Sequence, residues 1–290
     1  MRESITTKIA LIAPAQALVI AVIALPALWL FWLSFHTSSF GVAAVWVGFA
    51  NYAKILADPY FWRALRNTAV IVLVVVHLEL LIGLGMALLF AAGLPFKRLM
   101  LAVVLAPYAV SEVASVVIWR FLFDPDVGHV SFLLQSLGLP MLEWAVFPAH
   151  GLFLVALLSV WLHLPFTFMI LYAARLALPV ELYEAARIDG ATPWQAFRRV
   201  TLPLLLPAML IAALFRLIFA FRLFGEVWLL TEGGPARTTE VVAVYLYLEA
   251  FRYNAFGAAS ATGWLMVLAS LTLAAPYLVR LARSARDDAR

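Results

Sequence analysis

Residues 184–203 read EAARIDGATPWQAFRRVTLP, a polar and charged segment between two strongly apolar stretches. Good helix formers surround Glu184, and Pro179 stands where a helix start accepts proline. Gly190 permits a turn that a residue with a side chain would resist. Thr192 and Pro193 are typical of the cap and first position of a second helix. The sequence therefore predicts two short helices joined by a turn.

The composition indicates that the apolar stretches lie in a membrane. Of the 290 residues, 66% are hydrophobic and only 12% are charged, a far larger apolar share than a soluble domain carries. Cysteine is absent, which excludes disulfides, thiolate metal sites and cysteine nucleophiles. The net charge of +4 comes from basic residues scattered between apolar spans, so we expect no nucleic-acid partner.

Segments of roughly 20 or more mostly apolar residues predict membrane-spanning helices. The chain is expected to be an all-α integral membrane protein with six of them, at about 9–35, 68–92, 99–123, 151–176, 202–230 and 256–281. The first is too long for a signal peptide and lacks a convincing cleavage site, so we expect it to be retained. No linker or clear repeat divides the chain, which predicts one transmembrane domain over 1–290. The longer loops, 36–67, 124–150 and 231–255, are expected to hold short interfacial helices.

Lysine and arginine are distributed unevenly between the two sides of the predicted membrane. The side of residues 184–203 carries twelve: Arg2, Lys8, Lys97, Arg98, Arg175, Arg187, Arg198, Arg199, Arg280, Arg283, Arg286 and Arg290. The other side carries six: Lys54, Arg63, Arg66, Arg120, Arg237 and Arg252. The positive-inside rule then places both termini and the 184–203 segment in the cytoplasm.

Seven positions of this segment fit one spacing: Glu184-Ala185-Ala186, Gly190, Val200 and Leu202-Pro203. The spacing resembles the cytoplasmic coupling motif of the membrane subunits of bacterial ABC importers. The resemblance implies that a loop at about 177–201, between spans four and five, docks on an ATP-hydrolysing subunit. It assigns this role to Glu184, Ala185, Ala186, Asp189, Gly190, Arg198, Leu202 and Pro203. From the residues alone, two amphipathic helices that lie on the membrane surface remain an alternative.

Other stretches resemble the carbohydrate-uptake branch of these permeases. They are GFANY at 48–52 with Asp58, Phe61 and Asn67, and LTEGGP at 230–235 with Thr239 and Tyr247. The resemblance extends from about 14 to 277. It implies a sugar delivered by an external binding protein, a second permease expected to be a different chain, and two ATPase subunits that carry ATP and Mg. In one departure, the acid usual after Phe224 is replaced by Gly225, and Glu226 is displaced by one position.

The sequence Gly233-Gly234-Pro235 predicts a tight turn, because glycine supplies positive φ and proline stops a helix or strand. A turn there would shape the surface on which the external binding protein is expected to dock.

Ionisable residues inside the spans need an explanation, because a charge in the hydrocarbon core costs at least ~2.5 kcal/mol. Arg216 and Arg222 are six positions apart and lie on different faces of an ideal helix. Glu226 can meet Arg222 on one face, and Glu112 is a possible partner for Arg216. These residues either form ion pairs that fix helix packing or line a polar path for sugar hydroxyls. The candidate path consists of Glu112, Arg216, Phe219, Arg222 and Glu226.

Other side chains in the spans are weaker candidates. His77 and Glu79 differ by two positions and are expected to point apart, so they form no metal pair. His163 is expected to be a packed, hydrogen-bonded histidine or to line a cavity. Rings that could stack on a sugar, or serve only packing, are Trp119, Trp161, Tyr172, Phe219 and Phe221.

The chain contains no phosphate-binding loop and no metalloenzyme motif. We therefore expect a non-catalytic permease subunit of an ATP-driven importer, without a metal or cofactor of its own, in the inner membrane of a bacterium. One alternative is an ion-coupled secondary transporter that uses Glu112, Arg216 and Arg222. The other is an intramembrane lipid-sugar transferase, although the clustered acids that such an enzyme needs are not apparent.

Overall fold

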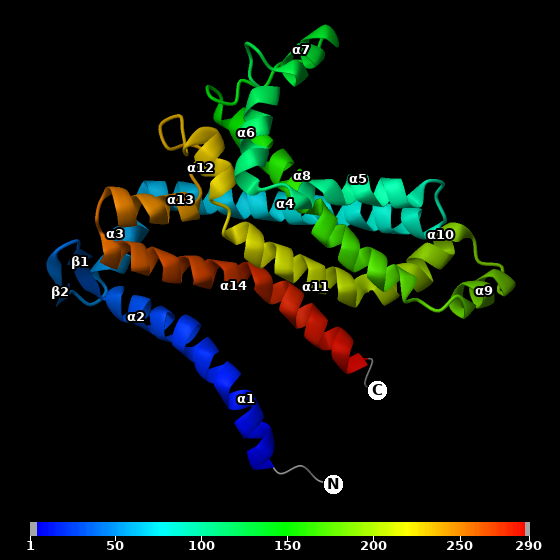
Figure 1. The fold of residues 1–290 in the computed structure, drawn as a ribbon, viewed down its shortest axis with the longest axis horizontal. Coiled ribbons are helices and arrows are strands. Elements are labelled where there is room, and N and C mark those ends of the chain that lie inside the picture. Colours follow the sequence, from blue (N-terminus) through cyan, green and yellow to red (C-terminus); the bar gives the residue numbers. More distant parts are fainter. Residues whose placement is uncertain (1–4, 288–290) are drawn as a thin grey trace. The chain divides into compact units, whose positions relative to one another are not determined.

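The computed structural model describes residues 5–287, most of which are helical (Figure 1). The helices are α1 (Ile5–Val19), α2 (Leu25–Leu33), α3 (Ala50–Ala57), α4 (Pro59–Ala91), α5 (Lys97–Ala109), α6 (Glu112–Leu122), α7 (His129–Ser136), α8 (Pro148–Leu176), α9 (Glu181–Ile188), α10 (Pro193–Ala196), α11 (Leu202–Phe221), α12 (Gly225–Thr231), α13 (Val242–Tyr247) and α14 (Phe256–Asp287). Single π-helical turns occupy Ile20–Ala24, Phe197–Thr201 and Leu248–Arg252. Two strands, β1 (His36–Ser39) and β2 (Val42–Trp46), complete the described elements.

Five helical stretches are long and apolar enough to cross a membrane, and the pair α5 and α6 would add a sixth if it counts as one span. The five are Ile12–Leu33, Pro59–Ala91, Pro148–Leu176, Pro193–Phe221 and Phe256–Arg283. Four of the predicted spans, the first, second, fourth and sixth, each correspond to one of these stretches. Of the basic residues used to predict orientation, Arg2 and Arg290 lie outside the described residues, as do the side chains of Lys8 and Arg286.

The predicted third span, 99–123, is not one straight helix. It is divided into α5 and α6, which meet at an angle of 100°. Pro107 in the last turn of α5 has no backbone N–H to donate, and Val110 is extended. Ser111 then caps the new helix, because its hydroxyl oxygen accepts a hydrogen bond from the Ala114 backbone N–H at 3.2 Å. The apolar run 99–123 therefore contains the end of one helix, at Ala109, and the start of another, at Glu112.

The predicted fifth span, 202–230, is also wrong as a single helix. Helix α11 ends at Phe221, and the backbone leaves the helical conformation at Phe224, with φ −130° and ψ −56°. A separate short helix, α12, begins at Gly225. This break separates Arg222 from Glu226, so the two residues do not share one helix face.

The chain divides into two compact units. The first consists of the chain up to Trp62 together with Tyr245–Leu268. In this unit Asn51 donates hydrogen bonds from Nδ2 to the carbonyl oxygens of Ser34 and His36, at 2.8 and 2.9 Å. The Tyr245 hydroxyl donates to Asp58 Oδ2 at 2.8 Å. The first two bonds join α3 to the end of α2 and the start of β1, and the third joins Asp58, between α3 and α4, to α13.

The loops contain the expected short helices, with one correction. Helix α7 lies in 124–150, and α13 with a π-helical turn lies in 231–255. Residues 36–46, however, form an antiparallel hairpin of β1 and β2, with His36 opposite Trp46. Gly41, with φ +75°, provides the turn conformation that joins the strands.

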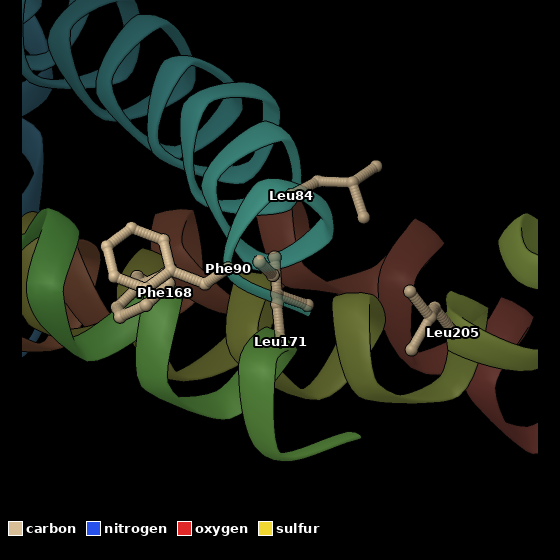
Figure 2. Packing of buried hydrophobic residues seen from close by; sticks show 6 residues of the cluster. Leu84, Phe90, Phe168, Leu171 and Leu205 are labelled. Carbon is tan, nitrogen blue, oxygen red and sulfur yellow. The ribbon is translucent and has the colours of Figure 1, made fainter. Parts of the chain in front are cut away.

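The second unit consists of Arg63–Val244 and the chain from Ala269 onward. Helix α8 packs against both α11 and α5 in it (Figure 1). Its hydrophobic core includes a cluster of Leu84, Ala87, Phe90, Phe168, Leu171 and Leu205. Figure 2 shows Phe90 of α4 beside Phe168 and Leu171 of α8, and the Phe90 and Phe168 ring centroids are 5.2 Å apart. This packing holds α4, α8 and α11 together.

Candidate functional site

A cavity of about 640 Å³ opens in the second unit, where α5, α6, α8, α11 and α12 meet. All five residues of the candidate path line it: Glu112, Arg216, Phe219, Arg222 and Glu226. They come from three different helices and the break after α11. The fold therefore brings together residues that lie up to 114 positions apart in the sequence.

Arg216 pairs with Glu79 and not with Glu112, which corrects the predicted partner. The guanidinium donates from Nε to Glu79 Oε2 at 2.5 Å and from Nη2 to Oε1 at 2.7 Å. The Thr167 hydroxyl also donates to Glu79 Oε2, at 3.2 Å. The side chains of Arg216 and Glu79 are 3% and 0% exposed. The predicted partner Glu112 and the observed partner Glu79 both lie in other helices than Arg216, and the sequence does not indicate which of these helices packs against α11.

Glu226 also has a different partner from the one predicted. It lies in the first turn of α12 and is almost fully buried. Its Oε1 is 3.5 Å from His163 Nε2 of α8, and the His163 side chain is 31% exposed. His163 lines the cavity and contacts an acid at once, so both predicted roles of this histidine are found together. Arg222 is exposed and lines the same cavity.

The position of the Glu112 carboxyl depends on the glycine at position 225. A Cβ atom built on Gly225 would overlap Oε1 of Glu112 and lie 2.9 Å from its Cδ. Gly225 thus leaves the space that the Glu112 carboxyl occupies beside Glu226. The permeases that this chain resembles usually have an acid at the position of Gly225, and here the carboxyl of Glu112 from α6 occupies the space beside that glycine.

Aromatic rings form another part of the cavity wall. Phe166 of α8 packs edge to face against Phe219, with centroids 6.2 Å apart, and stacks on Tyr108 of α5 at 6.5 Å. Sequence reasoning missed Tyr108, Phe166, Phe224 and Trp228, which also line the cavity. The positions of Phe224 and Trp228 depend on the break after α11, which the hydropathy pattern does not reveal.

Of the five rings that were expected either to stack on a sugar or to serve only packing, Phe219 alone is among the residues that line the cavity. Phe221 is buried, and Tyr172 stacks on Phe168 in the hydrophobic core, with centroids 5.4 Å apart. Trp119 and Trp161 pack against each other at 5.6 Å. The other four rings therefore serve packing in this structure.

His77 and Glu79 point apart, as predicted. Nδ1 of His77 lies 2.7 Å from the Leu73 carbonyl, and Nε2 lies 3.2 Å from the Tyr277 hydroxyl. Glu79 is buried against Arg216. Within residues 5–287, no group of three His, Cys, Asp or Glu residues could hold a metal ion.

The 177–201 segment has the local structure that the sequence predicts. Helix α9 ends at Ile188, Gly190 takes a left-handed φ of +75°, and α10 begins at Pro193. The Thr192 hydroxyl accepts from the Gln195 N–H at 3.3 Å, and Gln195 Oε1 accepts from the Thr192 N–H at 2.8 Å. This capping box fixes the start of α10.

Much of the segment's surface is free in the isolated chain. Glu184, Ala185, Asp189, Gly190, Arg198 and Pro203 are exposed, whereas Ala186 and Leu202 are half-buried. Two large apolar side chains, Ile188 and Trp194, are 86% and 66% exposed. Exposed apolar side chains of this kind are typical of a surface that contacts a protein or a membrane.

Gly233-Gly234-Pro235 forms the predicted tight turn, with Gly233 at φ +79°. The Thr239 hydroxyl donates to the Gly234 carbonyl at 2.6 Å, and the Thr239 N–H donates to the Gly233 carbonyl at 3.1 Å. The same loop is joined to α4, because Asn67 Nδ2 donates to the carbonyl oxygen of Glu240 at 2.9 Å.

Residues 79–284 match the family of binding-protein-dependent transport system inner membrane components. The match covers more than half of the chain and includes both the cavity and the 177–201 segment. The chain belongs to this family. It is a transport permease subunit and not an enzyme, and the ion-coupled transporter and transferase alternatives are thereby set aside.

This permease resembles characterised sugar permeases along most of its length. It is 32% identical over 278 residues to the trehalose/maltose transport system permease protein MalF of Thermococcus litoralis, covering 96% of this chain and 94% of that one. It is 34% identical over 253 residues to the trehalose transport system permease protein SugA of Mycobacterium tuberculosis, covering 87% and 80%. These matches support the carbohydrate-uptake branch that the sequence indicates.

The permease also shares its fold with a solved membrane transporter. A chain of a bacterial ABC transporter involved in import of the acidic polysaccharide alginate matches with a TM-score of 0.82 and 22% identity, over 94% of both chains. At this identity the match shows the fold alone.

Proposed function

We propose that this permease carries a carbohydrate through the cavity between α5, α6, α8, α11 and α12. The observation that carries the proposal is that this one cavity combines carboxylates with aromatic rings. Carboxylate oxygens of Glu112 and Glu226 accept hydrogen bonds from sugar hydroxyls, and Phe219 offers a ring face for the apolar side of a sugar. The names of the relatives, among them trehalose and maltose permeases, support a neutral sugar.

In this proposal the ionisable residues of the cavity have different roles. Arg216 already uses Nε and Nη2 on Glu79, so it holds α4 against α11 and shapes the cavity wall. Arg222 is exposed and forms no ion pair within 4.0 Å among residues 5–287, which leaves its guanidinium available to a ligand. Glu112, Glu226 and Arg222 are then the polar contacts, and Arg216 is a positioning residue.

We infer that the 177–201 segment couples the passage of the sugar through the cavity to ATP hydrolysis on two separate ATPase subunits, which bind ATP and Mg. Its exposed Glu184, Gly190 turn and exposed Trp194 support a docking role. The coupling role also places this segment and both termini in the cytoplasm, with six spans counting α5 and α6 as one and a single transmembrane domain over 1–290. The protein then lies in the bacterial inner membrane.

We further infer that the pathway is completed by a second, different permease chain. The Gly233-Gly234-Pro235 turn at the other end of the spans is the proposed docking surface for an external sugar-binding protein. The hydrogen bonds from Thr239 hold this turn in one shape, which a docking surface requires.

The coupling proposal is tested by co-purification from mild detergent. We compare the native chain with a Glu184→Lys, Gly190→Trp variant, and expect the ATPase subunit to be lost only from the variant. Gly138→Trp is a matched control, because Gly138 also has a left-handed φ, of +71°, with open space around it. Retention of the ATPase by the double variant, or its absence from the native preparation, contradicts the proposal.

The sugar proposal is tested by uptake of radiolabelled trehalose and maltose into cells that express the complete transporter. We expect saturable uptake of at least one neutral sugar that unlabelled sugar competes away. Uptake of a charged sugar alone, with no competition from neutral ones, contradicts it.

A further inference from the structure

A second pocket, of about 920 Å³, lies where α4 and α8 end, against α9 and α10. We call it the arginine groove, because Arg175 and Arg187 line it. Leu88 and Ala91, from the last turn of α4, form part of its apolar wall, and Trp194 of α10 also lines it. The groove is separate from the sugar cavity and shares no lining residue with it.

The groove carries positive charge that has no acidic partner. Arg175 stacks its guanidinium over the Tyr183 ring, with Cζ 4.4 Å from the centroid, and its buried Nε has no hydrogen-bond partner. Arg187 is exposed. Neither arginine forms an ion pair within 4.0 Å among the described residues, and no acidic side chain described here lines the groove. Arg175 and Arg187 each stand in the last turn of a helix, whose dipole favours a cation there. A dipole does not replace the acceptor that a buried N–H requires, however.

The rest of the lining is apolar and aromatic. The rings of Trp194 and Phe197 pack against each other at a tilt of 31°, with centroids 5.3 Å apart, and Trp194 is 66% exposed. Tryptophan and tyrosine are enriched at the headgroup level of a bilayer. The groove begins at the ends of two helices that can span a membrane, α4 and α8. The groove therefore lies where the headgroup of a bilayer lipid and the first carbons of its acyl chains would lie.

We propose that the arginine groove binds an anionic phospholipid. The lipid phosphate accepts hydrogen bonds from Arg175 and Arg187, and the glycerol and acyl carbons lie on Leu88 and Ala91. Basic pockets between spanning helices bind anionic headgroups in this way. A free phosphate would leave the apolar wall unused, so the lining favours a lipid. A lipid held between α4, α8 and the 177–201 segment would link the composition of the membrane to the position of that segment.

The test is native mass spectrometry of the detergent-purified transporter complex titrated with dioleoyl phosphatidylglycerol, with dioleoyl phosphatidylcholine as the neutral-headgroup probe. We expect the native complex to retain phosphatidylglycerol preferentially, and an Arg175→Gln, Arg187→Gln variant to bind it about tenfold more weakly. The matched control is Arg280→Gln, Arg283→Gln, which removes the same charge from exposed positions of α14 outside the groove. The control should change the affinity less than twofold. Since Arg175 also packs on Tyr183, Arg187→Gln alone is measured too, with an expected loss of about threefold.

Three outcomes overturn the proposal. The first is equal phosphatidylglycerol binding by the native and groove variants, or an equal loss in the α14 control. The second is displacement of the lipid by an equimolar amount of inorganic phosphate, which identifies a free-anion site. The third is loss of the ATPase subunit from the groove variant with unchanged lipid binding, which identifies an acidic protein partner as the occupant.

Discussion

Arg216 of α11 and Glu79 of α4 form a bidentate ion pair across 137 sequence positions, with both side chains buried. The geometry is the fork-to-carboxylate arrangement that lysine cannot reproduce. Because each charge is removed from water, either partner left alone is costly, whereas replacing both is much less so.

This relationship predicts the stability of variants at the pair. Glu79→Gln should destabilise the folded protein by about 3 kcal/mol, because it leaves the Arg216 charge buried without a counter-charge. The double variant Glu79→Met, Arg216→Met should recover most of that loss. Thermal unfolding in detergent, followed by fluorescence-detected size exclusion, measures the difference. Arg98→Met is the control: Arg98 is exposed and forms no ion pair within 4.0 Å among the described residues, so its loss should cost below about 1 kcal/mol.

Glycines in α4 give a matched pair of predictions. A Cβ at Gly83 would lie 3.3 Å from Thr167 Cγ2 and 3.4 Å from the Phe168 backbone nitrogen, whereas a Cβ at Gly85 would meet nothing within 4 Å. Gly83→Ala should therefore push α4 from α8 and lower the unfolding temperature. Gly85→Ala should be neutral or stabilise by up to about 1 kcal/mol, since alanine favours the helix. Equal effects of the two substitutions would contradict the close approach of α4 and α8.

Much of the fold follows from the sequence because hydropathy and local capping are short-range properties. The 177–201 segment shows this most clearly, since Gly190, Thr192 and Pro193 each determine their own backbone conformation. The breaks at Val110 and Phe224 were missed because both lie inside apolar runs, where hydropathy gives no signal. Pro107 followed by Ser111 was the available clue to the first.

The cavity was predicted as a set of residues but not as a set of contacts. Glu112, Arg216, Arg222 and Glu226 line it, because a charge in a span must face protein or water, and Phe219 lines it beside them. Their partners come from other helices: Glu79 for Arg216 and His163 for Glu226. A single sequence contains no information on which helices pack together. Glu112 of another span was therefore chosen for Arg216, and Glu226 was chosen for Arg222 by helix spacing, and both pairings were wrong.

Gly225 and Glu112 should behave as a coupled pair in transport. Gly225→Ala places a methyl group where the Glu112 carboxyl lies, so we expect a severalfold rise in the apparent KM for sugar uptake. Adding Glu112→Ala removes the clash, and the double variant should be no worse than Glu112→Ala alone, a non-additivity that marks direct contact. Strictly additive effects on KM would show that the glycine acts elsewhere.

Phe219 and Phe221 are close in sequence but differ in environment, which separates a ligand contact from a packing contact. Phe219 is 48% exposed and lines the cavity, while Phe221 is 2% exposed. Phe219→Ala should raise the apparent KM for sugar by about tenfold, equivalent to about 1.4 kcal/mol of stacking, with little change in unfolding temperature. Phe221→Ala should instead lower stability by about 3 kcal/mol through the vacated volume. Uptake kinetics and thermal unfolding are measured on the same two preparations. If Phe219→Ala destabilises the protein as much as Phe221→Ala and leaves KM unchanged, Phe219 has a structural role and the sugar passes by another route.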